Sequence, residues 1–330
     1  MKSEFQLIEA FARRIRRGGA RVPGVVVGVG DDAAVLRTPA REDLVATTDA
    51  LVEGVHFERP WFTGRALGWR LAAVNLSDIA AMGARPRFGL VSLAIPRGIP
   101  TRFSEDIERG VVDHLKRYGA VVVGGNVTSI DGPLVCDLTL LGTCSRGRAW
   151  RRAARAGDAI VVAGEIGAAA AGVALLREGK KTGPLVRACR RPVPRLDVVR
   201  ALGAGHGVHG AIDVSDGLSS DVIHACEAGG VGCDIDSPAL PIPGRVRAFC
   251  RARDLDPVAW ALHAGEDYAL ILSMAGRDAE DACRTIQRAG APASIVGRFT
   301  KHRGAYRVVD ANGRARRFRA RGWDHLKTGR

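Results

Sequence analysis

The chain of 330 residues carries a formal net charge of +14, and 46% of its residues are apolar. Because no run of about 18 apolar residues occurs, the sequence predicts no transmembrane helix. The positive charge would suit nucleic acid or a phosphorylated small molecule, but with only 5% aromatic residues the chain lacks the interleaved rings of a base-stacking platform.

The first half of the chain predicts alternating helices and strands. Residues 5–15 have the apolar period of an amphipathic helix, without the long apolar stretch of a secretory signal. Further along, β-branched runs closed by Gly, Pro or Asp predict strands, and apolar residues at helical spacing predict helices. The expected strands are 25–29, 44–48, 88–95, 120–123 and 134–142, and the expected helices are 63–82 and 101–118.

The alternation restarts after a stretch at 146–155 that holds five Arg and no carboxylate. We therefore predict two domains, 1–148 and 149–330, of the α/β class with α+β layers. In the second domain, strands are expected at 158–163, 211–213, 268–273 and 293–297. Helices are expected at 166–177, from about 216, and at 278–289, whereas 179–194 is interpreted as a linker.

Aspartates follow several of the short apolar runs. They are Asp31 and Asp32, Asp49, and Asp213 with Asp216. In open α/β sheets the corresponding edge is where ligands bind, and clustered carboxylates repel one another unless cations hold them. Oxygen ligands without His or Cys favour Mg²⁺. The alternative for each aspartate is a helix cap or a turn.

Asp78 lies on a stripe of the predicted helix 63–82 that is apolar apart from Asn75. A carboxylate on such a face is costly unless it is paired or binds a metal ion. A salt bridge to a buried Arg is the alternative interpretation. The pattern therefore adds Asp78 to the candidate metal ligands.

Glycines at 124 and 125, followed by Asn126, would let the backbone approach a phosphate. Neither a P-loop nor a GxGxxG motif occurs, so a bound ATP would be held by metal ions and Arg. Ser215 offers a hydroxyl at the start of a predicted helix. No nucleophile with a partnered base is evident, which suits phosphoryl transfer by positioning and charge neutralisation.

Seven cysteines are present, at positions 136, 144, 189, 226, 233, 250 and 283. An odd count without any CxxC motif predicts neither a disulfide framework nor a zinc site. We expect buried, reduced thiols in a cytoplasmic protein.

Taken in chain order, seven motifs resemble those of thiamine-monophosphate kinase, and the resemblance runs from about residue 5 to 326. The motifs are GVGDDAAVL, TTDALVEGVHF, VNLSDIAAMGA, GGN, DVSDGL, GEDY and GWDH. The resemblance implies the two-domain architecture of the superfamily shared with aminoimidazole-ribonucleotide synthetases and selenophosphate synthetases. It also implies a homodimer formed by the N-terminal domain, and direct transfer of the γ-phosphoryl group of ATP to thiamine monophosphate without a phosphoenzyme.

The resemblance also implies roles for individual residues. The implied Mg²⁺ ligands are Asp32, Thr47, Thr48, Asp49, Asp78, Asn126, Asp213 and Asp216. The implied ATP contacts are Gly125, Asn126, Arg152 and Ser215, and the implied substrate pocket holds His56, Glu266 and Trp323. Glu266 suits a cationic thiazolium, and Trp323 offers a ring face to it. The family commonly has Asp where this chain has Asn126, so we expect weaker Mg²⁺ binding here.

Two alternatives stay open. The first is a superfamily relative that phosphorylates another small acceptor. Selenophosphate synthetases, however, carry a reactive Cys or selenocysteine near the N-terminus, whereas the first cysteine here is Cys136, and the aminoimidazole-ribonucleotide branch does not predict the set His56, Glu266 and Trp323. The second is a basic nucleic-acid-binding protein, which the clustered aspartates oppose.

Overall fold

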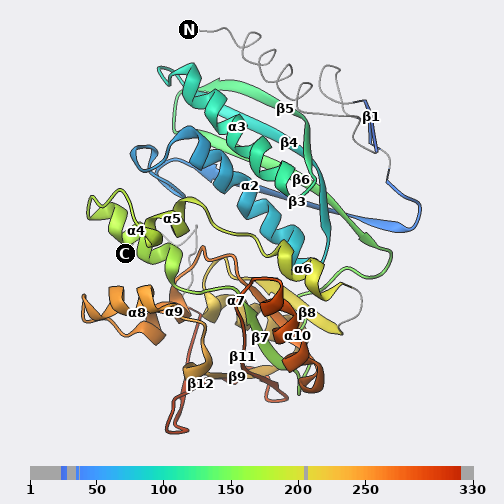
Figure 1. Cartoon of the computed structure of the whole chain (residues 1–330), viewed down its shortest axis with the longest axis vertical. Coiled ribbons are helices and arrows are strands. Elements are labelled where there is room, and N and C mark those ends of the chain that lie inside the picture. The colour runs from blue at the N-terminus through green and yellow to red at the C-terminus, as the bar shows by residue number, and fades with distance from the viewer. Residues whose placement is uncertain (1–23, 28–34, 37, 204–206, 321–330) are drawn as a thin grey trace. The chain divides into compact units, whose positions relative to one another are not determined.

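The computed structural model describes residues 24–27, 35–36, 38–203 and 207–320. These residues form two compact units (Figure 1). The first unit contains the described residues up to 79 and residues 84–149, and the second contains residues 80–83 and the described residues from 150 onward. The predicted helix 5–15, Asp32 and Trp323 lie outside the described residues. Within the described part, no helix is long and apolar enough to cross a membrane.

A four-stranded sheet is the centre of the first unit. Its strands are β3 (Glu42–Val52), β4 (Arg85–Pro96), β5 (Val121–Ile130) and β6 (Val135–Ser145), in the order β3-β6-β4-β5. Only β4 and β5 run parallel; the other two pairs are antiparallel. The short strands β1 (Val25–Val27) and β2 (Val35–Leu36) pair with each other.

Two helices, α2 (Gly64–Ala81) and α3 (Thr101–Arg117), lie along one face of this sheet (Figure 1). The other face carries the alternate residues of β3, which are all exposed: Leu44, Ala46, Thr48 and Ala50. Leu90 of β4 is also exposed, whereas the other residues of this strand, apart from Arg85, are buried or half-buried. The sheet therefore has one covered and one open face.

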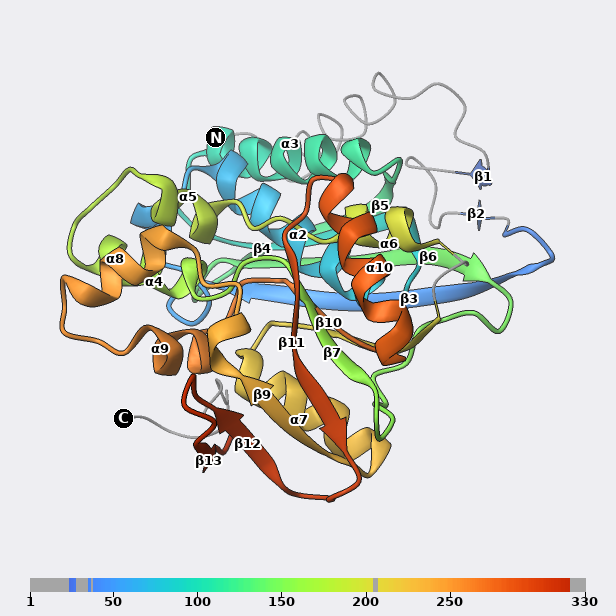
Figure 2. The ribbon, with the colours of Figure 1, turned by 60° about the horizontal axis from the view of Figure 1, so that its bottom comes forward.

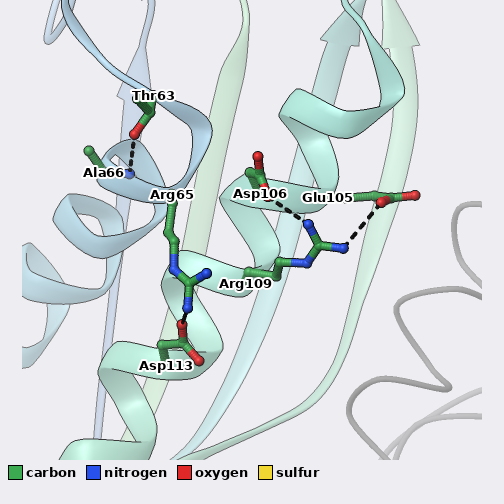
Figure 3. A network of polar contacts seen from close by, with 7 residues as sticks. All are labelled: Thr63, Arg65, Ala66, Glu105, Asp106, Arg109 and Asp113. Atoms are coloured by element: carbon green, nitrogen blue, oxygen red, sulfur yellow. Dashed lines mark hydrogen bonds and ion pairs between the residues drawn. The ribbon is translucent and has the colours of Figure 1, made fainter.

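The crossing of α2 and α3 depends on glycines. A Cβ on Gly68 would collide with the carbonyl of Ile107, and one on Gly110 would collide with the carbonyl of Arg65. Figure 3 shows the polar contacts beside this crossing, where Arg65 of α2 pairs with Asp113 of α3. The absence of side chains at the crossing lets the two backbones touch, so the helices pack at short range.

The second unit contains a seven-stranded sheet in the order β13-β12-β9-β11-β7-β10-β8. Apart from the parallel pair β9–β12, its strand pairs are antiparallel. The strands are β7 (Ala159–Ala163), β8 (Val208–Asp213), β9 (Gly232–Asp236), β10 (Leu270–Met274), β11 (Ala293–Thr300), β12 (Tyr306–Val309) and β13 (Ala315–Arg317).

Helices surround this second sheet (Figure 2). They are α4 (Ala168–Arg177), α5 (Pro184–Arg190), α6 (Leu196–Leu202), α7 (Leu218–Gly229), α8 (Gly244–Arg251), α9 (Pro257–His263) and α10 (Gly276–Arg288). All five residues of β7 are buried. Ile160 and Val162 belong to the main apolar core together with Val222 of α7, while α10 contacts β7 and β11. Single-turn 3₁₀ helices occur at Arg59–Trp61 and Ser237–Ala239.

The prediction of mixed α/β layers is confirmed, but several local predictions are wrong. The supposed linker 179–194 contains the helix α5. Asp49 lies inside β3 rather than after it, and Gly124, Gly125 and Asn126 lie inside β5. A Cβ on Gly125 would collide with the carbonyl of Val91, so this glycine admits the neighbouring strand. All seven cysteines are buried, as expected, and none is in a disulfide.

Candidate functional site

In the first unit, strand β3 and helix α2 bring Thr47 and Asp78 together. The Thr47 hydroxyl donates a short hydrogen bond to Oδ2 of Asp78. Burial raises the pKa of Asp78, and the Thr47 hydrogen bond opposes that shift. The sequence prediction that Asp78 occupies a buried face is confirmed, because its neighbours on α2 are almost all buried.

Asp49 of β3 is a second acidic residue close to Thr47 and Asp78. Burial, and then repulsion from Asp78 and Asp137, raise its pKa to about 7. Asp137 lies on β6, where the antiparallel register pairs it with Ala50, and its Oδ2 accepts a hydrogen bond from Thr48 Oγ1 at 3.2 Å. Asp49 thus lies close enough to both Asp78 and Asp137 to be repelled by them.

Asn126 and Gly125 are separated from Asp49 by the width of the sheet. β5 is the edge strand opposite β3, about 14 Å away at the usual spacing of strands. Asn126 pairs with Ser92 of β4, which in turn pairs with Asp137 of β6. Within one copy of the chain, Asn126 therefore cannot share an ion with Asp49.

His56 follows β3 in a turn. Its Nδ1 accepts a hydrogen bond from the backbone N–H of Val52 at 3.0 Å. Because Nδ1 is the acceptor, the proton of the neutral ring resides on Nε2. The ring orientation is thus set by the backbone.

In the second unit, Asp213, Ser215 and Asp216 lie at the end of β8 and in the loop that follows it. Asp213 ends β8 and is buried, whereas Ser215 and Asp216 are half-buried. The loop lies against the segment that carries Glu266, since the Glu266 N–H donates to the carbonyl of Ser215 at 2.8 Å. These two sets of predicted site residues are therefore neighbours.

The segment around Glu266 has an unusual backbone. Glu266 and Tyr268 adopt φ values of +66° and +53°, which non-glycine residues rarely do and which concentrate at functional sites. Between them, Asp267 accepts hydrogen bonds from the backbone N–H groups of Gly167 (2.5 Å) and Ala169 (3.0 Å), at the start of α4. Burial raises the pKa of Asp267 to about 7.

Arg152 is exposed and lies beside β8. The carbonyl of its neighbour Arg151 accepts the N–H of Ala211 at 2.8 Å, which fixes this segment next to the strand that ends at Asp213. An exposed guanidinium in this position is available for a phosphate.

Two acidic residues of these clusters were not predicted from the sequence. Asp137 could have been found because it interrupts an apolar strand on the face shared with Thr48. Asp221 is the second. It is 2% exposed and lies within 4.8 Å of potential ligand atoms of Asp216 and His224. Burial, and then repulsion from Asp213 and Asp216, raise its pKa to about 8.

In both clusters the donor chemistry suits a hard divalent cation such as Mg²⁺, and in the second one the potential ligand atoms of Asp216, Asp221 and His224 lie within 4.8 Å of one another. The donors are oxygen atoms of carboxylates and hydroxyls, apart from His224. Mutual repulsion and burial work against ionising these carboxylates together, and a bound cation would reverse this cost. The donor chemistry therefore agrees with the Mg²⁺ expectation.

The fold and this site chemistry define the class of the protein. Residues 30–144 match the family model "AIR synthase related protein, N-terminal domain", and residues 155–310 match "AIR synthase related protein, C-terminal domain". The thiamine-monophosphate kinase of Rhodopirellula baltica is 32% identical over 97% of this chain and 98% of its own length.

Solved structures agree with this assignment. The crystal structure of thiamine-monophosphate kinase from Stenotrophomonas maltophilia K279a is 33% identical with a TM-score of 0.82, and the match covers 92% of this chain and 96% of that chain. The structure "AaThiL complexed with AMPPCP and TMP" is 28% identical with a TM-score of 0.77 and covers 99% of both chains. The chain belongs to the thiamine-monophosphate kinase family, as its motifs predicted.

Proposed function

We propose that this chain transfers the γ-phosphoryl group of ATP to the phosphate of thiamine monophosphate. A phosphate oxygen of thiamine monophosphate forms the new bond to the γ-phosphorus, the bond from that phosphorus to the β–γ bridging oxygen breaks, and ADP leaves. The products are thiamine diphosphate and ADP. The observation that carries the proposal is the pair of partly buried acidic clusters in a chain related over nearly its whole length to thiamine-monophosphate kinases.

Each site residue has a proposed task. Mg²⁺, when bound, would neutralise charge on the phosphates. The residues that would hold it are Asp32, Thr47, Thr48, Asp49, Asp78, Asn126, Asp213 and Asp216. Gly125, Asn126, Arg152 and Ser215 would contact ATP. His56, Glu266 and Trp323 would form the pocket for thiamine monophosphate. No side chain acts as a nucleophile.

Domain roles follow from the same assignment. Residues 1–148 would bind ATP and Mg²⁺ and form the dimer, and residues 149–330 would complete the nucleotide and substrate cleft. The buried free thiols support a cytoplasmic location.

A homodimer is supported by the open face of the first sheet. Leu44 and Leu90 are 55% and 38% exposed there, and large apolar side chains on a sheet face favour association. Asn126 lies at the edge opposite β3, so a second copy is the means by which it could meet Thr48 on the open face of another β3. A symmetric pair would complete two such sites at once.

A product assay tests the proposal. Purified protein would be incubated with ATP, Mg²⁺ and thiamine monophosphate, and the products separated by chromatography. We expect thiamine diphosphate and ADP in equal amounts. ATP turnover without thiamine diphosphate would redirect the acceptor to other small molecules, and no turnover by the folded protein would contradict the proposal.

A further inference from the structure

Asp221 lies in the first turn of α7, and its side chain points back to the loop that precedes the helix. Its Oδ2 accepts two backbone hydrogen bonds, from Asp216 and from Gly217, each at 3.1 Å. The residue is 2% exposed. A buried carboxyl oxygen that receives two amide hydrogens fixes the backbone that supplies them.

The loop held by Asp221 is locked to the Glu266 segment by its own backbone. Besides the Glu266–Ser215 bond, Tyr268 N–H donates to the carbonyl of Val214 at 2.9 Å. A Cβ on Gly265 would lie 2.5 Å from the Ser215 carbonyl, so the two segments are in direct backbone contact. A shift of the loop would therefore move the backbone of Glu266 as well.

A second tether joins α7 to the same segment. The Ser219 hydroxyl and His263 Nδ1 are 2.9 Å apart. Gly217 adopts φ +112°, and a Cβ there would lie 3.0 Å from the backbone of His263. The start of α7, the loop at 213–217 and the segment at 263–268 thus form one packed unit, with Asp221 in its interior.

We propose that Asp221 is a positioning residue, which holds the backbone of Asp216 and Gly217 so that Ser215, Asp216 and Glu266 keep one fixed arrangement. This inference rests on the proposed function, which places Ser215 and Asp216 at the nucleotide and Glu266 at the acceptor. Asp221 acts on the site indirectly, because its carboxyl oxygen accepts the two backbone hydrogen bonds that hold the loop. Accepting these bonds does not require the negative charge of the carboxylate.

Two substitutions separate this role from direct metal binding. Asp221→Asn keeps an oxygen that can accept both amide hydrogens but removes the charge, whereas Asp221→Ala removes the acceptor. Glu227→Gln is the matched control, because Glu227 is on the same helix with its side chain 61% exposed. A direct metal ligand would be damaged by either substitution at 221.

The kinetic test measures kcat, the KM for ATP, the KM for thiamine monophosphate and the half-saturating Mg²⁺ concentration. We expect Asp221→Ala to raise the ATP and Mg²⁺ constants about 10-fold to 100-fold, with Asp221→Asn and Glu227→Gln within about twofold of the parent. Equal damage from Asn and Ala would overturn the positioning role, and so would unchanged constants in Asp221→Ala.

Amide hydrogen exchange gives a readout that does not depend on activity. In Asp221→Ala the amides of Asp216 and Gly217 should exchange faster while the amides of β10 stay protected, and Asp221→Asn should protect them as the parent does. Loss of that protection in Asp221→Asn would also overturn the proposal, even if Asp221→Ala does not fold. If the parent makes no thiamine diphosphate, the proposed function fails while the exchange experiment still decides the role of Asp221.

Discussion

At the scale of single residues, the first unit concentrates negative charge where solvent is partly excluded. Asp49 experiences burial and the repulsion of Asp78 and Asp137, which together raise its pKa to about 7. Thr47 satisfies one oxygen of Asp78 but brings no positive charge. Such a set of groups is stable in its ionised form when a cation is bound.

Replacing Asp49 or Asp78 by Asn should therefore slow catalysis strongly while leaving the fold intact. Each amide is nearly isosteric with the carboxylate but removes a charge from the site. We expect the rate of thiamine diphosphate formation to fall by about 100-fold or more, measured by the chromatographic assay. Asp131→Asn is the control, since its side chain is 86% exposed; an active Asp49→Asn enzyme would remove Asp49 from the metal site.

At Asn126 the metal site can be tested by adding a negative charge instead of removing one. A carboxylate at this position would add a charge, so Asn126→Asp should lower the Mg²⁺ concentration needed for half-maximal activity, by about tenfold if one ion gains a charged ligand. A Mg²⁺ titration of the parent and the variant at fixed ATP measures this. An unchanged Mg²⁺ dependence would show that Asn126 does not contact the metal.

At the scale of elements, the contact between α2 and α3 determines how Asp78 is presented to β3. The crossing is closed by Gly68 and Gly110, which leave no room for a Cβ. Arg109 pairs within α3 with Asp106 at 2.7 Å and Glu105 at 3.5 Å (Figure 3). These pairs are half-buried, and ion pairs between neighbouring turns of one helix contribute little to stability, so the close backbone packing is the stronger determinant.

Gly68→Val should consequently destabilise the protein although valine is a better helix former than glycine. The added side chain would meet the Ile107 backbone, which cannot move aside as a side chain would. We expect a loss of about 3 kcal/mol in the free energy of unfolding, measured by urea denaturation. Gly132→Ala is the control, because its Cβ would lie 3.7 Å from the Ile130 side chain; an equal loss in both variants would contradict the packing argument.

At the scale of the whole molecule, stability depends on pH through the buried aspartates. Asp49, Asp221 and Asp267 have folded pKa values raised to about 7, 8 and 7 by burial. Because these values exceed the unfolded ones, the groups stabilise the fold fully below about pH 4, and that contribution is lost as the pH rises through about 7 to 8. A cation bound by ionised Asp49 would counteract the part of the loss that comes from this residue.

Mg²⁺ should therefore raise the melting temperature more at about pH 8.5 than at about pH 6, since ligands must be ionised to bind. Thermal unfolding with Mg²⁺ and with a chelator, at both pH values, measures the difference. In Asp49→Asn the pH dependence of this shift should shrink. A Mg²⁺ shift that is equal at both pH values would contradict the assignment of Asp49 as a metal ligand.

The open sheet face makes a further prediction about assembly. Leu90→Glu places a charge on the open face of the first sheet and should shift the protein from dimer to single chain. Light scattering coupled to size-exclusion chromatography measures the mass. Leu255→Glu is the control, because Leu255 is similarly exposed, at 39%, but lies in the second unit. A parent that is already a single chain would contradict the dimer.

The sequence by itself determined the family, the mixed α/β layers, and Thr47, Asp78, Asp213 and Glu266 as candidates, because ordered motifs and buried-face carboxylates are local signals. It did not determine which candidates meet. Strand order separates Asn126 from Asp49, and antiparallel register brings Asp137 beside Thr48. In the sequence, nothing distinguishes Asp221 from an ordinary helical residue. In the structure, tertiary packing buries it against two backbone amides. Pairing between distant strands and the burial of a polar group depend on the whole chain, and only the tertiary structure could decide them.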